Sequence, residues 1–304
     1  GCGCIIMGLP KYYELYRPFL KALSDEKVHT LKEIKDYITK LLNLNEELLL
    51  ERLPSGKQTI YDNRIGWART YLKKAGLISS PQRAHLQITV EGQALLASGV
   101  NITDRLLAER YSEFADFIIG GKKIAKQKDN IEETILETPQ ETLERVFKNI
   151  NKQLADDLLT EIMNQSATFF ENIVVDLMQL MGYGDGFVTK ASRDDGIDGV
   201  INEDKLGFNL IYIQAKRWNP NTTIGKPEIQ KFAGAMMGPP KIEKGLFITT
   251  AKYSQGAKEF ANAQHIILVD GQKLTELMIE YGLGVSVQNI YKIKRIDSDY
   301  FSES

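Results

Sequence analysis

Cysteine is scarce in this sequence of 304 residues. Both cysteines, Cys2 and Cys4, lie in the opening GCGCII, and none follows. Two neighbouring cysteines without further partners rarely make a site, although a metal or disulfide role is the alternative interpretation. The hexapeptide resembles an upstream remnant, so Met7 is the expected native start. A chain otherwise free of cysteine suits a reducing compartment, and we expect a cytoplasmic protein that needs no disulfide.

Long apolar runs, phosphate-binding loops and histidine clusters are also lacking. No apolar stretch reaches the roughly 18 residues that a membrane span needs, and no secretory leader is evident. The absence of a GxxxxGK[ST] loop argues against ATP-driven translocation by this chain alone. The three histidines, His29, His85 and His265, are scattered, which argues against a zinc site and a nucleophilic triad.

The chain has little net charge, −2 at pH 7, so as a whole it is not a basic nucleic-acid binder. Its hydrophobic fraction of 43% predicts a globular protein, and its length allows two domains. Residues 52–83 depart from the charge balance, with seven Lys or Arg residues and a single acidic residue, Asp62. This local basic patch is typical of a nucleic-acid-binding surface.

The N-terminal third has a helical pattern followed by a β-ribbon. Apolar spacing predicts helices over 12–23 and 31–42, and a third helix in IYDNRIGWARTYLKKAGL that ends at Gly76. LISSPQRAHLQIT follows as two short strands, and another helix opens near Thr89. This order predicts a winged helix-turn-helix over residues 7–100 that binds double-stranded DNA. The alternative is a small helical domain whose basic face is only solvated.

The third helix has a predicted buried stripe of Ile65, Ala68, Leu72 and Ala75. Other polar positions, among them Asn63 and Arg64, fall largely away from that stripe. We therefore expect an electrostatic DNA surface on the exposed side of this helix and on the wing. Its predicted members are Arg64, Lys73, Lys74 and Arg83.

The rest of the chain divides into a linker and an α/β core. Residues 101–145 are acidic and polar, and we interpret them as a partly helical linker. Residues 146–295 begin with two amphipathic helices and continue with strands, first in hairpins and later alternating with helices. This pattern predicts an α/β fold with a mixed sheet.

Polar side chains interrupt one strand of this core, in NLIYIQAKRW. Strands alternate faces, so Gln214 and Lys216 share one face, opposite Ile213. The segment NEDKLGFN is long enough for a hairpin that places Asp198 beside them. A carboxylate, an amide oxygen and an ammonium that converge at one sheet end are the equipment for metal-assisted phosphodiester hydrolysis.

Each of these residues also has a plainer interpretation. Asp198 follows a glycine-containing loop and could serve as a turn residue. Gln214 could be a satisfied strand amide, and Lys216 could extend its ammonium to solvent from the strand end. Glu203 and Asp204 are interpreted as residues of a solvated turn.

The spacing Asp198-x15-Gln-x-Lys, preceded by the helix FFENIVVDLMQLMGYG, resembles the PD-(D/E)xK nuclease core. It is similar, more narrowly, to the Mrr-type restriction endonucleases, in which glutamine replaces the second acidic residue. YDNRIGWARTYLKKAGL with ITVEG resembles the N-terminal domain of that family, and FITT and LVDGQKLTELMIE resemble the end of its core. Arg193 and Asp195 stand where glycines are common in that loop, a departure that removes no ligand.

The resemblance implies a type IV enzyme that cuts methylated double-stranded DNA with Mg²⁺. Carried over by position, Asp198 is the central metal ligand, Gln214 a neutral oxygen ligand and Lys216 the ammonium that orients water. Glu171 is the helix carboxylate that binds the metal directly or through water; by itself it would be interpreted as a solvated helix edge. A double-strand break implies at least a transient dimer, and no membrane partner is expected.

Two other functions are compatible with parts of the sequence. A structure-specific repair nuclease has a similar core but usually lacks an added winged helix. A non-catalytic DNA-binding regulator with a decayed core should have lost at least one of the four site residues, and all four are present.

Overall fold

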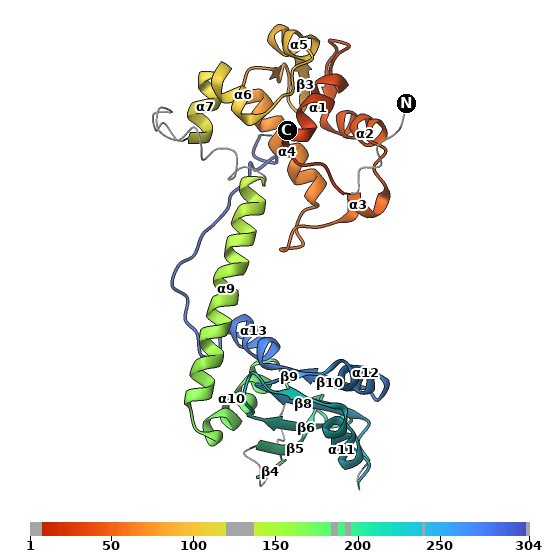
Figure 1. Ribbon diagram of the computed structural model, residues 1–304, viewed down its shortest axis with the longest axis vertical. Helices are drawn as coiled ribbons and strands as arrows, with labels where there is room; N and C mark the ends of the chain where they lie inside the picture. Colours follow the sequence, from red (N-terminus) through yellow and green to blue (C-terminus); the bar gives the residue numbers. More distant parts are fainter. Residues whose placement is uncertain (1–7, 120–136, 184–187, 192–195, 239–240, 302–304) are drawn as a thin grey trace. The chain divides into compact units, whose positions relative to one another are not determined.

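The computed structural model describes residues 8–119, 137–183, 188–191, 196–238 and 241–301 (Figure 1). The chain divides into two compact units, Gly1–Lys148 and Asn149–Ser304. Within the described ranges, no helix has both the length and the apolar character needed to cross a membrane.

The N-terminal unit combines helices with a small antiparallel sheet of strand order β1-β3-β2. Thr30 and Glu33 form a capping box at the start of the second helix. Gly76 adopts a φ of 74° immediately after the fourth helix, where its amide and that of Leu77 bond back to the last turn, so a residue without a Cβ is favoured there. The elements are η1 Tyr13–Leu15, α1 Tyr16–Ala22, β1 His29–Thr30, α2 Leu31–Leu41, α3 Glu46–Leu50, α4 Ile60–Lys74, β2 Ile78–Ser79, β3 His85–Ile88 and α5 Val90–Ala97. The helices and the β-ribbon expected here are present, whereas α3 was not predicted.

Two further helices, α6 (Asp104–Arg110) and α7 (Ser112–Ile119), complete this core. Leu107 and Phe114 are fully buried in it. The hydroxyls of Tyr12 and Tyr16 donate to the Asp104 carboxylate, the second at 2.6 Å. Burial raises the pKa of Asp104, although these two hydrogen bonds oppose the shift. Part of the segment interpreted as a linker therefore contributes to the N-terminal hydrophobic core.

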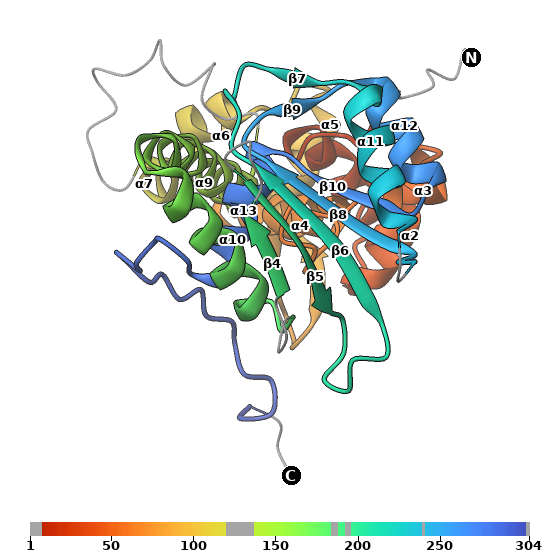
Figure 2. The same ribbon diagram turned by 90° about the horizontal axis from the view of Figure 1, so that it is seen from below.

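The C-terminal unit is built on a mixed five-stranded sheet of order β10-β8-β6-β5-β4 (Figure 2). Strands β4, β5 and β6 pair antiparallel, and β6, β8 and β10 pair parallel. The mixed α/β core predicted from the sequence is confirmed. Its elements are α9 Pro139–Asn164, which begins in the N-terminal unit, α10 Ala167–Leu180, β4 Val188–Ala191, β5 Gly196–Asn202, β6 Leu210–Lys216, β7 Thr223–Ile224, α11 Lys226–Met236, β8 Lys244–Thr249, β9 Lys252–Tyr253, α12 Gln255–Ala263, β10 Ile266–Val269 and α13 Gly271–Tyr281.

Helices cover both faces of this sheet (Figure 2). Ile213 and Ala215 of β6 are fully buried in the hydrophobic cluster that includes α10 and α13. Tyr212 points to the other face, where it packs on Phe232 of α11 with ring centroids 5.2 Å apart. The alternation predicted for this strand is therefore present, and Gln214 and Lys216 lie on the α11 side.

Candidate active site

The β5–β6 hairpin brings Asp198 and Gln214 side by side. They are directly paired across the two strands, and Gln214 Nε2 donates to Asp198 Oδ1 over 2.6 Å. Both side chains are partly exposed. Burial raises the pKa of Tyr212, and the charge of Asp198 on the same face raises it further. The hairpin predicted from the spacing of these residues is thus confirmed.

The register of this hairpin is fixed at its turn. The Asp204 carboxylate accepts hydrogen bonds from the amides of Leu206, Phe208 and Asn209, the last over 2.8 Å. These bonds hold the pKa of Asp204 below its ordinary value. A one-residue slip would turn Asp198 to the opposite face of the sheet, so this carboxylate supports the site from a distance. Asp204 is a turn residue, as its sequence context indicated.

Lys216 ends β6 on the same face as Gln214. Hydrogen bonding from Thr249 Oγ1 to the Lys216 carbonyl over 2.9 Å fixes the strand end to β8. The lysine is 9% exposed, and its Nζ lies 3.8 Å from Glu228 Oε2 and 5.2 Å from the centroid of the Trp218 ring. The ammonium is therefore held inside the protein, which contradicts the alternative of a solvent-extended lysine.

The donor set at this hairpin fits a hard divalent cation. Mg²⁺ is commonly bound through one or two carboxylates together with water and substrate phosphate, and Asp198 offers one carboxylate. Gln214 can present either its nitrogen or its oxygen to the same position, because the two ends of an amide are exchanged by a rotation. Among the described residues, no group of three or more His, Cys, Asp or Glu side chains could hold a metal. The fit therefore depends on the amide and on ligands from outside the chain.

Glu171 lies near the start of α10 and is partly exposed. Within the described part of the chain, it makes no hydrogen bond or ion pair with Asp198, Gln214 or Lys216. The structure thus brings three of the four predicted catalytic residues together, and Glu171 is not in direct contact with them. Arg193 and Asp195, the residues that depart from the family pattern, lie outside the described residues.

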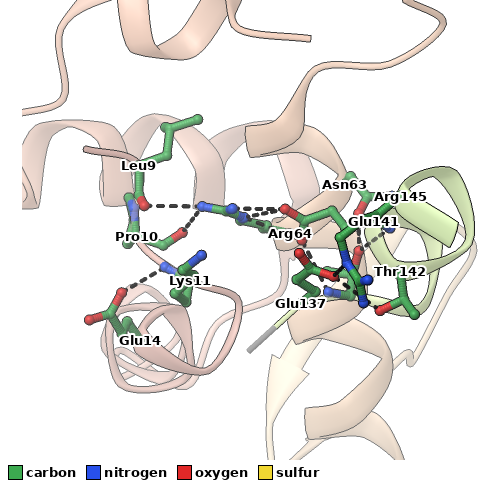
Figure 3. Close-up of polar contacts among 11 residues, drawn as sticks. Leu9, Pro10, Lys11, Glu14, Asn63, Arg64, Glu137, Glu141, Thr142 and Arg145 are labelled. Carbon is green, nitrogen blue, oxygen red and sulfur yellow. Dashed lines mark hydrogen bonds and ion pairs between the residues drawn. The ribbon is translucent and has the colours of Figure 1, made fainter. Parts of the chain in front are cut away.

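Arg64 does not lie on an exposed face, in contrast to the sequence prediction. It is 8% exposed, and its guanidinium donates to Glu141 of α9 and to the carbonyls of Leu9 and Pro10 (Figure 3). The Nη2–Oε1 distance to Glu141 is 2.7 Å. The neighbouring Asn63 is 4% exposed. The apolar stripe of α4 did not reveal this placement, because the helix buries a second face against the first turn of α9. The placement argues against a DNA contact by Arg64.

The other three predicted DNA-binding residues are exposed. Lys73 and Lys74 lie in the last turn of α4, and Arg83 lies in the turn between β2 and β3. Lys73 Nζ donates to Ser80 Oγ over 3.3 Å, which joins the end of the helix to the base of this turn. Lys74 Nζ lies 5.0 Å from the centroid of the Phe117 ring.

Glu228 is a residue that the sequence did not single out. It lies in the first turn of α11, and its contact with Lys216 depends on the path of the chain between β6 and α11. The only sequence signal is an acidic residue after Pro227, which is also an ordinary helix start.

The family models that this chain matches define a restriction endonuclease. Residues 162–278 match a family model described as restriction endonuclease, and residues 12–98 match the Mrr N-terminal domain. The chain is 33% identical to the type IV methyl-directed restriction enzyme EcoKMrr of Escherichia coli (strain K12), across 97% of this chain and 100% of that protein. This chain therefore belongs to the Mrr family of restriction endonucleases.

Two solved structures resemble parts of the chain. The DNA modification-dependent restriction endonuclease AspBHI is 18% identical with a TM-score of 0.34, over 42% of this chain and 36% of its own. The MspJI restriction endonuclease, in complex with a 27-mer oligonucleotide, is 18% identical with a TM-score of 0.28, over 45% of this chain and 30% of its own.

Proposed function

We propose that this restriction endonuclease hydrolyses phosphodiester bonds in methylated double-stranded DNA, with Mg²⁺ at the β5–β6 hairpin. The observation that carries the proposal is the pairing of Asp198 with Gln214, next to the buried ammonium of Lys216 on the same strand. Membership of the Mrr family and the methyl-directed activity in the name of the E. coli relative support the choice of substrate.

Each residue of the proposed site has a distinct part. Asp198 and Gln214 would hold the ion through oxygen, and Glu171 would bind it directly or through water. The bound ion would polarise the phosphoryl group and acidify water. Lys216, 9% exposed at the end of β6, would orient the attacking water and offset the negative charge that develops on the phosphate.

Methylation dependence is tested with one plasmid prepared in three states: unmethylated, adenine-methylated and cytosine-methylated. We expect cleavage of a methylated form in Mg²⁺ and none in EDTA, measured as loss of supercoiled DNA. Equal cleavage of all three forms would contradict methylation dependence and favour a structure-specific nuclease. Binding without cleavage of any form would favour a DNA-binding regulator.

We further propose that residues 7–100 bind DNA as a winged helix-turn-helix and that residues 146–295 are the catalytic domain. Of the segment 101–145 interpreted as a linker, α6 and α7 belong to the core of the N-terminal unit. The exposed Lys73, Lys74 and Arg83 form the proposed DNA surface. The enzyme acts in the cytoplasm and cuts both strands as at least a dimer, because one site cuts one strand.

Replacing Lys73 and Lys74 together with alanine should weaken DNA binding and flatten its salt dependence. Each phosphate contact contributes about 0.9 to the slope of log affinity against log salt, so the slope should fall by about 2. Titrations at several salt concentrations measure it. Lys27→Ala with Lys40→Ala removes the same charge from exposed positions outside the basic patch of residues 52–83 and should change the slope less. An unchanged slope for the Lys73/Lys74 variant would locate the DNA surface elsewhere.

A further inference from the structure

The buried ammonium of Lys216 has a carboxylate beside it. Among the ion pairs of the described residues, Lys216 pairs with Glu228. The centroid of the Trp218 ring lies 5.2 Å from the same Nζ. Since a lysine side chain has a flexible four-carbon stem, its direction inside the protein depends on such neighbours.

Glu228 is itself held in place. It lies in the first turn of α11, where the positive end of the helix dipole favours a negative charge. Its Oε1 accepts from Lys231 Nζ over 3.0 Å, which leaves Oε2 directed at Lys216. At 28% side-chain exposure, Glu228 lies between the buried lysine and the 75% exposed Lys231.

The distance between Glu228 and Lys216 matters for what the pair can do. A strong charge-assisted hydrogen bond spans about 2.7–2.9 Å, and this contact spans 3.8 Å. Glu228 therefore attracts the ammonium without fully engaging its three N–H donors. Those donors stay available on the face of β6 that carries Gln214.

We propose that Glu228 is a positioning residue for Lys216, which aims the ammonium at the reacting phosphate and water. This inference rests on the proposed catalytic role of Lys216. Glu228 contacts the lysine through its carboxylate, so its removal should alter turnover and leave DNA recognition by the N-terminal unit unchanged.

The test compares Glu228→Gln, which keeps the shape and removes the charge, with Glu228→Asp, which keeps the charge and shortens the side chain. Residues that orient metal ligands typically account for about 10–100-fold in activity, and we expect a factor of the same order for a residue that orients Lys216. We expect kcat on methylated plasmid to fall by that factor in Glu228→Gln, with an intermediate kcat in Glu228→Asp. KM for DNA should match that of Glu259→Gln, a control that neutralises an exposed glutamate on the neighbouring α12.

The outcomes separate this inference from the proposed function. Wild-type kcat in Glu228→Gln, with an inactive Lys216→Ala, would overturn the positioning role and leave the proposed site intact. Cleavage by Lys216→Ala would overturn the proposed site itself. Recovery of Glu228→Gln by higher Mg²⁺ would make Glu228 a metal ligand and also overturn the inference. If circular dichroism shows that Glu228→Gln is unfolded, the kcat of Glu228→Asp tests the inference instead. An intermediate kcat supports the inference, and a wild-type kcat overturns it.

Discussion

Alanine at Asp198 or at Lys216 is expected to abolish cleavage of methylated plasmid while DNA binding persists. Removing one group that stabilises the charge developing in the transition state typically costs about 10²–10³-fold in kcat, and Asp198→Ala also removes the carboxylate that is proposed to hold the metal. Affinity for DNA should change little, because the exposed basic residues of α4 and the β2–β3 turn belong to the other unit. Single-turnover cleavage and gel-shift titration measure the two effects separately.

Gln214 gives a sharper form of this experiment. Gln214→Glu supplies a carboxylate in place of an amide, and a carboxylate is the better ligand for a hard cation. Half-maximal cleavage should therefore need less Mg²⁺, whereas Gln214→Ala should need more or lose activity. Gln255→Glu, which adds the same charge at an exposed position of α12, is the control. An unchanged Mg²⁺ requirement in Gln214→Glu would contradict a role of this residue in metal binding. Wild-type cleavage by Asp198→Ala would contradict the proposed active site as a whole.

Arg64→Ala should destabilise the N-terminal unit by about 3–5 kcal/mol, the usual cost of leaving one member of a buried ion pair without its partner. The substitution would leave the Glu141 carboxylate without the guanidinium that pairs with it. It would also remove the hydrogen-bond donors of two backbone carbonyls, those of Leu9 and Pro10. Urea unfolding measures the change, and in a Trp218→Phe background Trp67 fluorescence reports on this unit alone. Arg69→Ala, on an exposed position of the same helix, should change stability by less than about 0.5 kcal/mol. A similar small effect for Arg64→Ala would show that the ion pair is not needed.

The same ion pair should make stability depend on pH. Burial by itself raises the pKa of Glu141, but the hydrogen bonds from Arg64 and Thr138 outweigh it and hold the pKa below its ordinary value of 4.5. A depressed pKa in the folded state contributes stability above the ordinary value. That contribution is lost as the pH falls below 4.5 and through the lower folded pKa. In Arg64→Ala this part of the acid dependence should shrink.

The sequence predicted the features that depend on local periodicity. Alternation along β6 gave the face shared by Gln214 and Lys216, and the short connection gave a hairpin that fixed the position of Asp198. Arg64 could not be placed in this way, because its partner Glu141 lies 77 positions further along the chain. Glu228 was not predicted for a related reason, because only the folded path of the chain after β6 brings it to Lys216.

The position of the first turn of α9 has a practical consequence for the design of fragments and chimeras of Mrr-type enzymes. Thr138 donates to Asn63 over 2.5 Å, and Glu144 accepts from the amide and hydroxyl of Ser55, in addition to the contacts of Arg64. A fragment that stops at residue 100 would lack all of these partners, along with Leu107 and Phe114. A junction placed after Lys148 keeps them, so a chimera that exchanges the N-terminal unit should be spliced inside α9 rather than in front of it.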